Sequence, residues 1–275
     1  MKRTLLLFLI VIFYQINQSN AKQRELNKGT AVVFGVDVLL RSLPLQTGNI
    51  IDVVPIASKI EIIDKASLLT KSGDIADYWY KVKYKEQEGF IWGALIADNF
   101  FDSDLDSDGS AETFMILNLS KSASDSDFVE INSRIEFRVA RNGQMVYEHK
   151  QFAESAMNID SISYEKLKLF TPDLSVMRIK YSFSGIYSGN AEQFMRFNNN
   201  HIDSLFTMHY SEGEGGTRCL SELVLPSDKE GKANSVVIKT KCADVSFCDY
   251  ITGNPPCKWE YANKTLVWDG KKLKP

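Results

Sequence analysis

Short apolar runs rich in β-branched and aromatic residues alternate with polar positions along this chain, and Gly, Pro, Asn, Asp or Ser separates one run from the next. Such runs are typical of strands in an all-β fold. In the first third they predict strands over residues 31–34, 38–40, 50–54, 59–64, 78–84 and 88–92. The connection over residues 65–77 is long for a hairpin, and we expect a loop there that could carry recognition.

The same pattern continues over residues 113–275, with tight-turn signals between the runs. Asn142 and Gly143 form a strong hairpin signal, and three asparagines at 198–200 separate two further alternating runs. Residues 161–170 are open to two interpretations, a short helix or a strand. The pattern predicts a second antiparallel β domain, either a sandwich or a partial barrel.

Several residues of the first region agree in order and spacing with the bacterial SH3 (SH3b) family. They are Leu40, Arg41, Ser42, Trp79, Tyr80, Val82, Gly89, Phe90, Ile91 and Leu95. The segment resembles that family over about a quarter of the chain. The pattern of short strands favours a small barrel that binds or positions rather than catalyses. The resemblance implies an SH3b-like module, with cell-wall peptides and glycans as candidate ligands between which it does not choose.

Within such a barrel, Trp79 and Phe90 are expected to be buried, and Gly89 is expected at a tight or bulged turn. Aromatic and basic side chains left on the surface suit a groove for a peptide or glycan strand. The candidate ligand-binding residues are Tyr78, Lys81, Tyr84 and Trp92.

The N-terminus has the pattern of a secretory signal peptide. Lys2 and Arg3 precede an apolar run over residues 5–14, and Ala21 ends a stretch of small residues suited to cleavage. The run is too short to span a bilayer, so a permanent anchor is disfavoured and the protein is not expected to be an integral membrane protein. We therefore predict a leader over residues 1–21 and an exported protein, periplasmic, cell-surface or secreted.

Charge then excludes one class of partner. Loss of Lys2 and Arg3 with the leader lowers the formal net charge from −3 to −5. Nucleic-acid binders need clustered Lys and Arg to replace phosphate counterions, whereas the basic residues here are dispersed among acidic ones. Nucleic acid is therefore not an expected ligand.

The four cysteines lie in the last quarter of the chain, where an exported protein favours disulfides. Of the three possible connectivities, we favour Cys219–Cys242 between neighbouring strands and Cys248–Cys257 across a loop. Free thiols and a metal site are the alternatives, and the metal is disfavoured because no Cys-x-x-Cys spacing occurs.

An acidic junction over residues 99–112 separates the two regions and contains the motif DLDSDGSAE. Asp104, Asp106, Asp108 and Glu112 place carboxylates at alternate positions around Gly109, as a calcium loop requires. The motif resembles the loops of FG-GAP-like and dockerin-like repeats over residues 104–112, which implies a structural calcium ion. Met115 stands where an EF-hand needs Glu. An Asp-rich turn without an ion and a flexible linker are the alternatives.

No catalytic arrangement is supported. All three histidines, His149, His201 and His209, precede every cysteine, the reverse of the order in NlpC/P60-type cell-wall peptidases. The carboxylate pairs 125/127 and 212/214 lie in Ser- or Gly-rich stretches typical of exposed loops.

The sequence therefore predicts four segments: a signal peptide (1–21), an SH3b-like barrel (29–98), the acidic junction (99–112) and a C-terminal β domain (113–275). The predicted function is binding or envelope organisation without catalysis. One alternative is an envelope hydrolase with its active site in the C-terminal domain and the barrel as targeting part. Another is a structural or inhibitory partner of another envelope protein.

Overall fold

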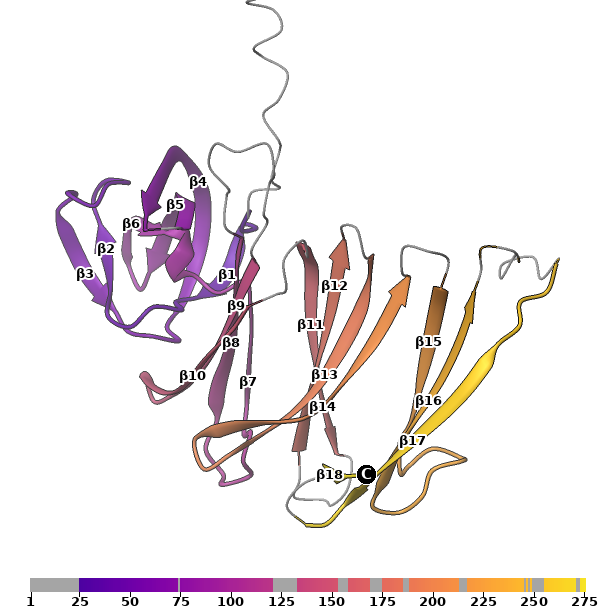
Figure 1. The fold of residues 1–275 in the computed structure, drawn as a ribbon. Coiled ribbons are helices and arrows are strands. Elements are labelled where there is room, and N and C mark those ends of the chain that lie inside the picture. The colour runs from indigo at the N-terminus through magenta and orange to yellow at the C-terminus, as the bar shows by residue number, and fades with distance from the viewer. Residues whose placement is uncertain are drawn as a thin grey trace, which may run out of the picture.

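The computed structural model is an all-β protein whose strands form three antiparallel sheets (Figure 1). It describes residues 25–73, 75–120, 133–152, 158–168, 175–184, 188–212, 217–244, 246, 248, 255–270 and 273–275. Apart from one 3-10 turn, η1 (Gly93–Leu95), the elements of this part are strands. The predicted fold class is therefore confirmed, whereas the predicted signal peptide lies outside the described residues.

The first sheet has six strands in the order β1-β4-β5-β6-β2-β3. Its members are β1 (Gly29–Val32), β2 (Val38–Arg41), β3 (Ile50–Val54), β4 (Lys59–Ser72), β5 (Ile75–Tyr84) and β6 (Gln87–Trp92). All six strands were predicted, with bounds that differ by a few residues except in β4. We refer to this sheet as the barrel, and its interior is a cluster of aliphatic residues around the fully buried Tyr80.

The expected loop over residues 65–77 is wrong, because most of it is a two-stranded arm. β4 continues to Ser72 and pairs with the start of β5, with Leu69 opposite Tyr78 and Thr70 opposite Asp77. A bulge between Lys65 and Leu69 accommodates the extra residues. Gly73, with a positive φ of 59°, lies at the turn.

Two further expectations for the barrel need correction. Gly89 lies inside β6 rather than at a turn. A glycine is needed there because β2 passes so close that a Cβ would approach the Arg41 carbonyl oxygen to 2.8 Å. The turn falls at Lys85, which takes a positive φ of 53°. Trp79 is buried as predicted, but Phe90 is only partly buried, because the strand alternation turns Ile91 inward instead.

The second sheet has four strands in the order β10-β9-β8-β7, and we refer to it as the middle sheet. Its members are β7 (Asn99–Ser103), β8 (Glu112–Ser120), β9 (Ser133–Arg141) and β10 (Gln144–Phe152). The first residues of the acidic junction thus form β7, which pairs with β8 across the Asp-rich loop. Asn142 and Gly143 form the predicted tight turn between β9 and β10, both with positive φ.

The third sheet has eight strands that follow one another in chain order and curl into a half-barrel (Figure 1). They are β11 (Asn158–Lys168), β12 (Ser175–Ser184), β13 (Ser188–Asn198), β14 (His201–Glu212), β15 (Thr217–Val224), β16 (Ser235–Asp244), β17 (Glu260–Trp268) and β18 (Leu273–Lys274). β11 settles the ambiguity in favour of a strand up to Lys168, and residues 169 and 170 lie outside the described residues. Asn199 and Asn200, both with positive φ, form the predicted turn between β13 and β14.

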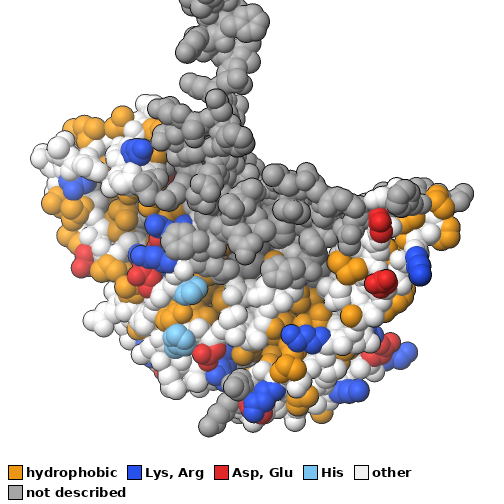
Figure 2. Space-filling view, viewed as in Figure 1, with side chains coloured by type: hydrophobic (Ala, Val, Ile, Leu, Met, Phe, Trp, Pro, Cys, Tyr) orange, Lys and Arg blue, Asp and Glu red, His pale blue; other side chains and the backbone are white. Residues whose placement is uncertain are grey.

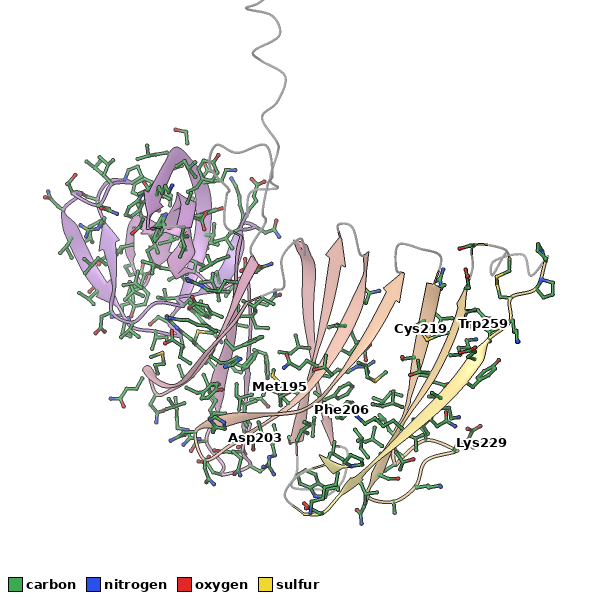
Figure 3. The ribbon with its side chains drawn as sticks, viewed as in Figure 1. Met195, Asp203, Phe206, Cys219, Lys229 and Trp259 are labelled. Atoms are coloured by element: carbon green, nitrogen blue, oxygen red, sulfur yellow. A yellow bond between two sulfur atoms is a disulfide. The ribbon has the colours of Figure 1, made fainter. Side chains whose placement is uncertain are left out.

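Apolar clusters lie between neighbouring sheets and inside the half-barrel. One connects the barrel to the middle sheet and contains Val32 and Phe34 from the barrel with Met115, Leu117 and Ala140 from β8 and β9. A second packs the other face of the middle sheet against β12–β14, including Met195. A third lies inside the half-barrel, where Phe194 stacks on Phe206 at 4.3 Å between ring centroids. Met195 and Phe206 accordingly point to different sides of the half-barrel wall (Figure 3).

Both predicted disulfides are present. Cys219 and Cys242 lie directly opposite each other on β15 and β16 with a Cα–Cα distance of 4.1 Å, and Cys219 is labelled in Figure 3. Cys248 and Cys257 close a short loop before β17. Disulfides are typical of oxidising compartments outside the cytoplasm. Among the described residues, none belongs to a helix of the length and apolar character that a membrane crossing needs.

Candidate functional site

Two tryptophans lie opposite each other on neighbouring barrel strands, Trp79 on β5 and Trp92 on β6. Each indole N–H donates a hydrogen bond to the arm or its base: Trp79 to the Thr70 hydroxyl at 2.7 Å and Trp92 to the Asp77 carbonyl oxygen at 3.0 Å. Because the polar edge of each ring is satisfied within the protein, the ring orientation is fixed before any ligand arrives.

Asp77, whose carbonyl oxygen accepts the Trp92 indole N–H, is itself held in a fixed position. Its side chain is only 2% exposed, and one carboxylate oxygen accepts the Tyr78 backbone N–H at 2.7 Å. Gly93 allows the carboxylate to lie there, because a Cβ at that position would come within 2.7 Å of it. The glycine after Trp92 is therefore a packing requirement of the tryptophan pair.

The tryptophans form part of the wall of a pocket of about 650 Å³, which is within the size range of ligand sites. The turn before β2 and residues of β2 also line the pocket, and Leu95 adds an apolar side chain. Three charged residues also line the pocket, namely Asp37, Arg41 and Arg138. Aromatic, aliphatic and oppositely charged groups thus converge on one concavity.

Both arginines are held in place by backbone carbonyl groups. Arg41 donates to the Gly48 carbonyl oxygen at 2.8 Å, and Arg138, from β9 of the middle sheet, donates to that of Phe34 at 2.7 Å. The Arg138 guanidinium also stacks 4.4 Å from the centroid of the Phe34 ring and pairs with Glu148. Burial acts to raise the pKa of Glu148, but the Arg138 hydrogen bond and charge outweigh it, so that this pKa is lowered.

Of the four predicted ligand-binding residues, the structure places Trp92 at the pocket. The other three lie elsewhere on the barrel. Tyr78 packs against the barrel interior with the Lys65 ammonium 4.5 Å above its ring, and Tyr84 packs against the same interior. Lys81 pairs with Glu88 at 2.7 Å. The sequence missed Asp37 and Arg138 altogether, and it singled out Arg41 only as part of the SH3b-like pattern.

The predicted calcium loop brings three of its four carboxylates together. Oxygen atoms of Asp104, Asp106 and Asp108 lie within 4.8 Å of one another, about the greatest separation that two ligands of one calcium ion allow. Gly109 has the positive φ of 92° that the turn requires. The fourth residue, Glu112, is fully buried and faces inward, where it accepts the Leu105 backbone N–H at 2.8 Å.

A residue that the sequence did not single out, Arg141 at the end of β9, contacts this loop. Its Nε donates to Glu112 at 2.7 Å, and its Nη2 lies 2.9 Å from an Asp106 oxygen and 3.3 Å from an Asp108 oxygen. The hydrogen bond to Glu112, followed by that to Asp106, raises the pKa of Arg141. One guanidinium therefore offsets part of the negative charge that a cation would otherwise balance.

Backbone N–H groups donate hydrogen bonds to other carboxylate oxygens of the loop. The Asp108 and Gly109 N–H groups donate to the two oxygens of Asp104, each at 3.1 Å, and Ser110 donates to Asp108 at 2.8 Å. This Ser110 bond, together with Arg141, lowers the pKa of Asp108. The three aspartates fit a calcium ion in type and spacing, whereas Glu112 belongs to the arginine contact. Calcium binding stays a prediction.

The histidines form no further site among the described side chains. The His201 ring meets Tyr147 edge-on at 5.3 Å, and its Nε2 lies 3.8 Å from an Asp203 oxygen. His149 stacks on Phe137. The His209 side chain and both predicted carboxylate pairs, 125/127 and 212/214, lie outside the described side chains.

Fold and site together define an all-β protein with a small barrel, a tryptophan-lined pocket and a disulfide-containing half-barrel. Compared with known families, the chain matches no family model, and no curated protein matches it in sequence. The likeness to SH3b modules therefore rests on the residues named above.

Proposed function

We propose that this is an exported, non-catalytic protein whose barrel pocket binds a cell-wall peptide or glycan and so helps to organise the envelope. The observation that carries the proposal is the pair Trp79 and Trp92, fixed through their indole N–H groups at one wall of a pocket that also contains two arginines. Pre-oriented aromatic rings bind with little loss of side-chain entropy. The two disulfides are consistent with an oxidising compartment.

Of the two ligand classes, the charges favour the peptide. A guanidinium has five N–H donors, and the Gly48 carbonyl takes one from Arg41. Arg41 thus keeps further donors, whereas Arg138 is engaged with the Phe34 carbonyl oxygen and with Glu148. Arginine donors suit carboxylates, which the short peptides of bacterial cell walls carry and neutral glycan chains lack. Asp37, an exposed residue that also lines the pocket, suits an amino group of the same peptide.

Calorimetric titration of the purified protein with three probes tests the proposal: a disaccharide-tetrapeptide from peptidoglycan, the free tetrapeptide and a chitin tetrasaccharide. We expect binding of the first two, quenching of tryptophan fluorescence, and a loss of about tenfold or more in affinity in Trp92→Ala, in the range of an aromatic hot spot. The matched control is Tyr261→Ala, which removes an aromatic ring that is 75% exposed on β17. Absence of binding by all three probes, or equal losses in both variants, would overturn the proposal.

A further inference from the structure

A different surface of the barrel lies at the free edge of its sheet. β3 ends the six-stranded sheet, and among the described strands it pairs only with β2. Its residues Ile50, Ile51 and Val53 are 58%, 36% and 46% exposed. An exposed edge strand presents backbone N–H and C=O groups that another strand can pair with, and natural proteins usually cover or charge such edges.

The apolar surface continues into the connection between β2 and β3. Leu43 and Leu45 are 53% and 42% exposed there, and with Ile50, Ile51 and Val53 they form what we call the β3 edge patch. Residues 42–51 include no charged side chain, and Asp52 is the one charged residue of β3. In Figure 2, hydrophobic side chains gather on the flank of the barrel where Figure 1 shows β2 and β3.

The patch is held in a defined shape. The Ser42 N–H donates to the Asn49 carbonyl oxygen at 2.9 Å, and the Gly48 N–H donates to that of Leu45 at 3.0 Å. Gly48 lies so close to Leu43 that a Cβ would come within 2.9 Å of the Leu43 carbonyl oxygen. The two exposed leucines therefore belong to a self-bonded turn and not to an open loop.

One backbone donor of β3 has a replaceable partner. The Val53 N–H donates to the carboxylate of the preceding residue, Asp52, at 2.8 Å. The partner of this N–H is therefore a side chain of the same strand. A carbonyl oxygen of an added strand can take the place of that carboxylate at the edge.

The exposed area indicates the size of the partner. From the exposed fractions of its five side chains, the patch offers on the order of 400 Å² of surface, within the range of functional patches on monomers. A standard interface between two folded proteins uses about 800 Å² on each side. The area therefore suits a single extended strand better than a second folded domain or a second copy of this chain.

We propose that β3 accepts, as a seventh strand of the barrel sheet, an extended segment of a partner protein that is rich in β-branched apolar residues and uncharged. Backbone pairing along β3 supplies the affinity, and the exposed Ile51 and Val53 contact alternate side chains of the added strand. None of the five side chains of the β3 edge patch lines the tryptophan pocket, although β2 and Gln46 of the connection border both surfaces, and the two proposals are tested separately.

The test is a titration of the ¹⁵N-labelled protein with the blocked peptide acetyl-TVTVTVT-amide, monitored by NMR. We expect shifts of the Ile51 and Val53 amide signals and slower hydrogen exchange of the Val53 amide, because it gains a carbonyl partner. The same peptide with Pro at its central position should bind about tenfold more weakly, because proline cannot donate to the ladder.

Two lysine variants provide a matched pair. Val53→Lys places a charge on the edge patch, and Leu69→Lys places one on an equally exposed residue of the β4–β5 arm, since both side chains are 46% exposed. We expect Val53→Lys to weaken peptide binding by about tenfold and Leu69→Lys to leave it unchanged. Thermal melts establish that both variants fold.

Four outcomes would overturn the proposal. The first is the absence of shifts in β3 at millimolar peptide, and the second is equal binding by the two lysine variants. The third is a set of shifts confined to Arg41 and Trp92, which would place the peptide in the pocket and leave the proposed function standing. The fourth is concentration-dependent association of the peptide-free protein that Val53→Lys abolishes, which would assign the edge to a second copy of this chain.

Discussion

The tryptophan pocket and the acidic loop differ in what the protein does with their polar groups. In the pocket, the hydrogen bonds fall on the edges of Trp79 and Trp92 and on one donor of Arg41, and they leave the ring faces and the other Arg41 donors to a ligand. In the acidic loop, the hydrogen bonds fall on the carboxylate oxygens, which are the atoms that would bind calcium. A motif with suitable residues can therefore bind a ligand only to the extent that its ligand-binding atoms are not already hydrogen-bonded within the protein.

The largest expected effect comes from removing the internal cation of the acidic loop. Arg141→Ala leaves the fully buried Glu112 without its guanidinium, and we expect a loss of about 3 kcal/mol in the free energy of unfolding. Urea denaturation monitored by circular dichroism measures it. Glu112→Gln in the same background should restore part of the loss, because a neutral amide is less costly to bury. A loss no greater than that of Lys258→Ala, an exposed lysine, would mean that the loop does not depend on Arg141.

The corresponding change in the pocket is Thr70→Val, which keeps the side-chain shape but removes the acceptor of the buried Trp79 indole N–H. We expect a loss of about 2 kcal/mol in unfolding free energy, together with altered tryptophan emission. Thr207→Val, at an exposed position of β14, serves as the control. If the two variants were equally stable and had unchanged emission, the hydrogen bond would not be what fixes the Trp79 ring.

A smaller effect is expected from calcium itself. If the three aspartates bind the ion in the millimolar range, 5 mM calcium should raise the free energy of unfolding by about 1 kcal/mol relative to chelator. Thermal melts measure the shift, and Asp106→Ala or Asp104→Asn should abolish it. Identical midpoints with calcium and with chelator would leave Arg141 and backbone donors as the partners of the loop.

The smallest effect is a pH dependence of the loop. The pKa of Asp108 is lowered from its ordinary value of 3.8 by the Ser110 bond and by Arg141, so ionised Asp108 stabilises the folded state at neutral pH. That stabilisation should begin to decline as the pH falls to about 4 and be lost below the folded-state pKa. Asp108→Asn should therefore be less stable than the parent at pH 7, and the difference should shrink as the pH falls below about 4. A difference that stays constant with falling pH would rule out this linkage.

Features carried by neighbouring residues were predictable from the sequence. The barrel strands follow local alternation, the Asn142-Gly143 turn follows from the positive φ that both residues tolerate, and the two disulfides follow from an even number of cysteines near predicted strands. Trp92 was identified because an aromatic residue on a short amphipathic strand is a recognisable surface candidate.

Features that depend on distant residues were not predictable. Arg138 reaches the pocket from a strand about a hundred residues further along the chain, and nothing in its local pattern distinguishes it from other arginines. The same holds for Arg141, whose partner Glu112 had already been assigned to an ion. The β4–β5 arm was missed because a bulge interrupts its alternation, and Phe90 because a large ring in a small barrel is usually taken as core.

The apolar cluster between the barrel and the middle sheet bears on whether the barrel can be separated from the rest of the chain. Val32, Phe34 and Ile56 are fully buried against Met115 and Leu117, so a fragment ending at residue 98 would present that surface to water. The middle sheet is in turn packed against β12–β14 through its other face, so a fragment of barrel and middle sheet would also expose apolar surface. We therefore expect the three sheets to be kept together, in inheritance and in engineering, as one unit.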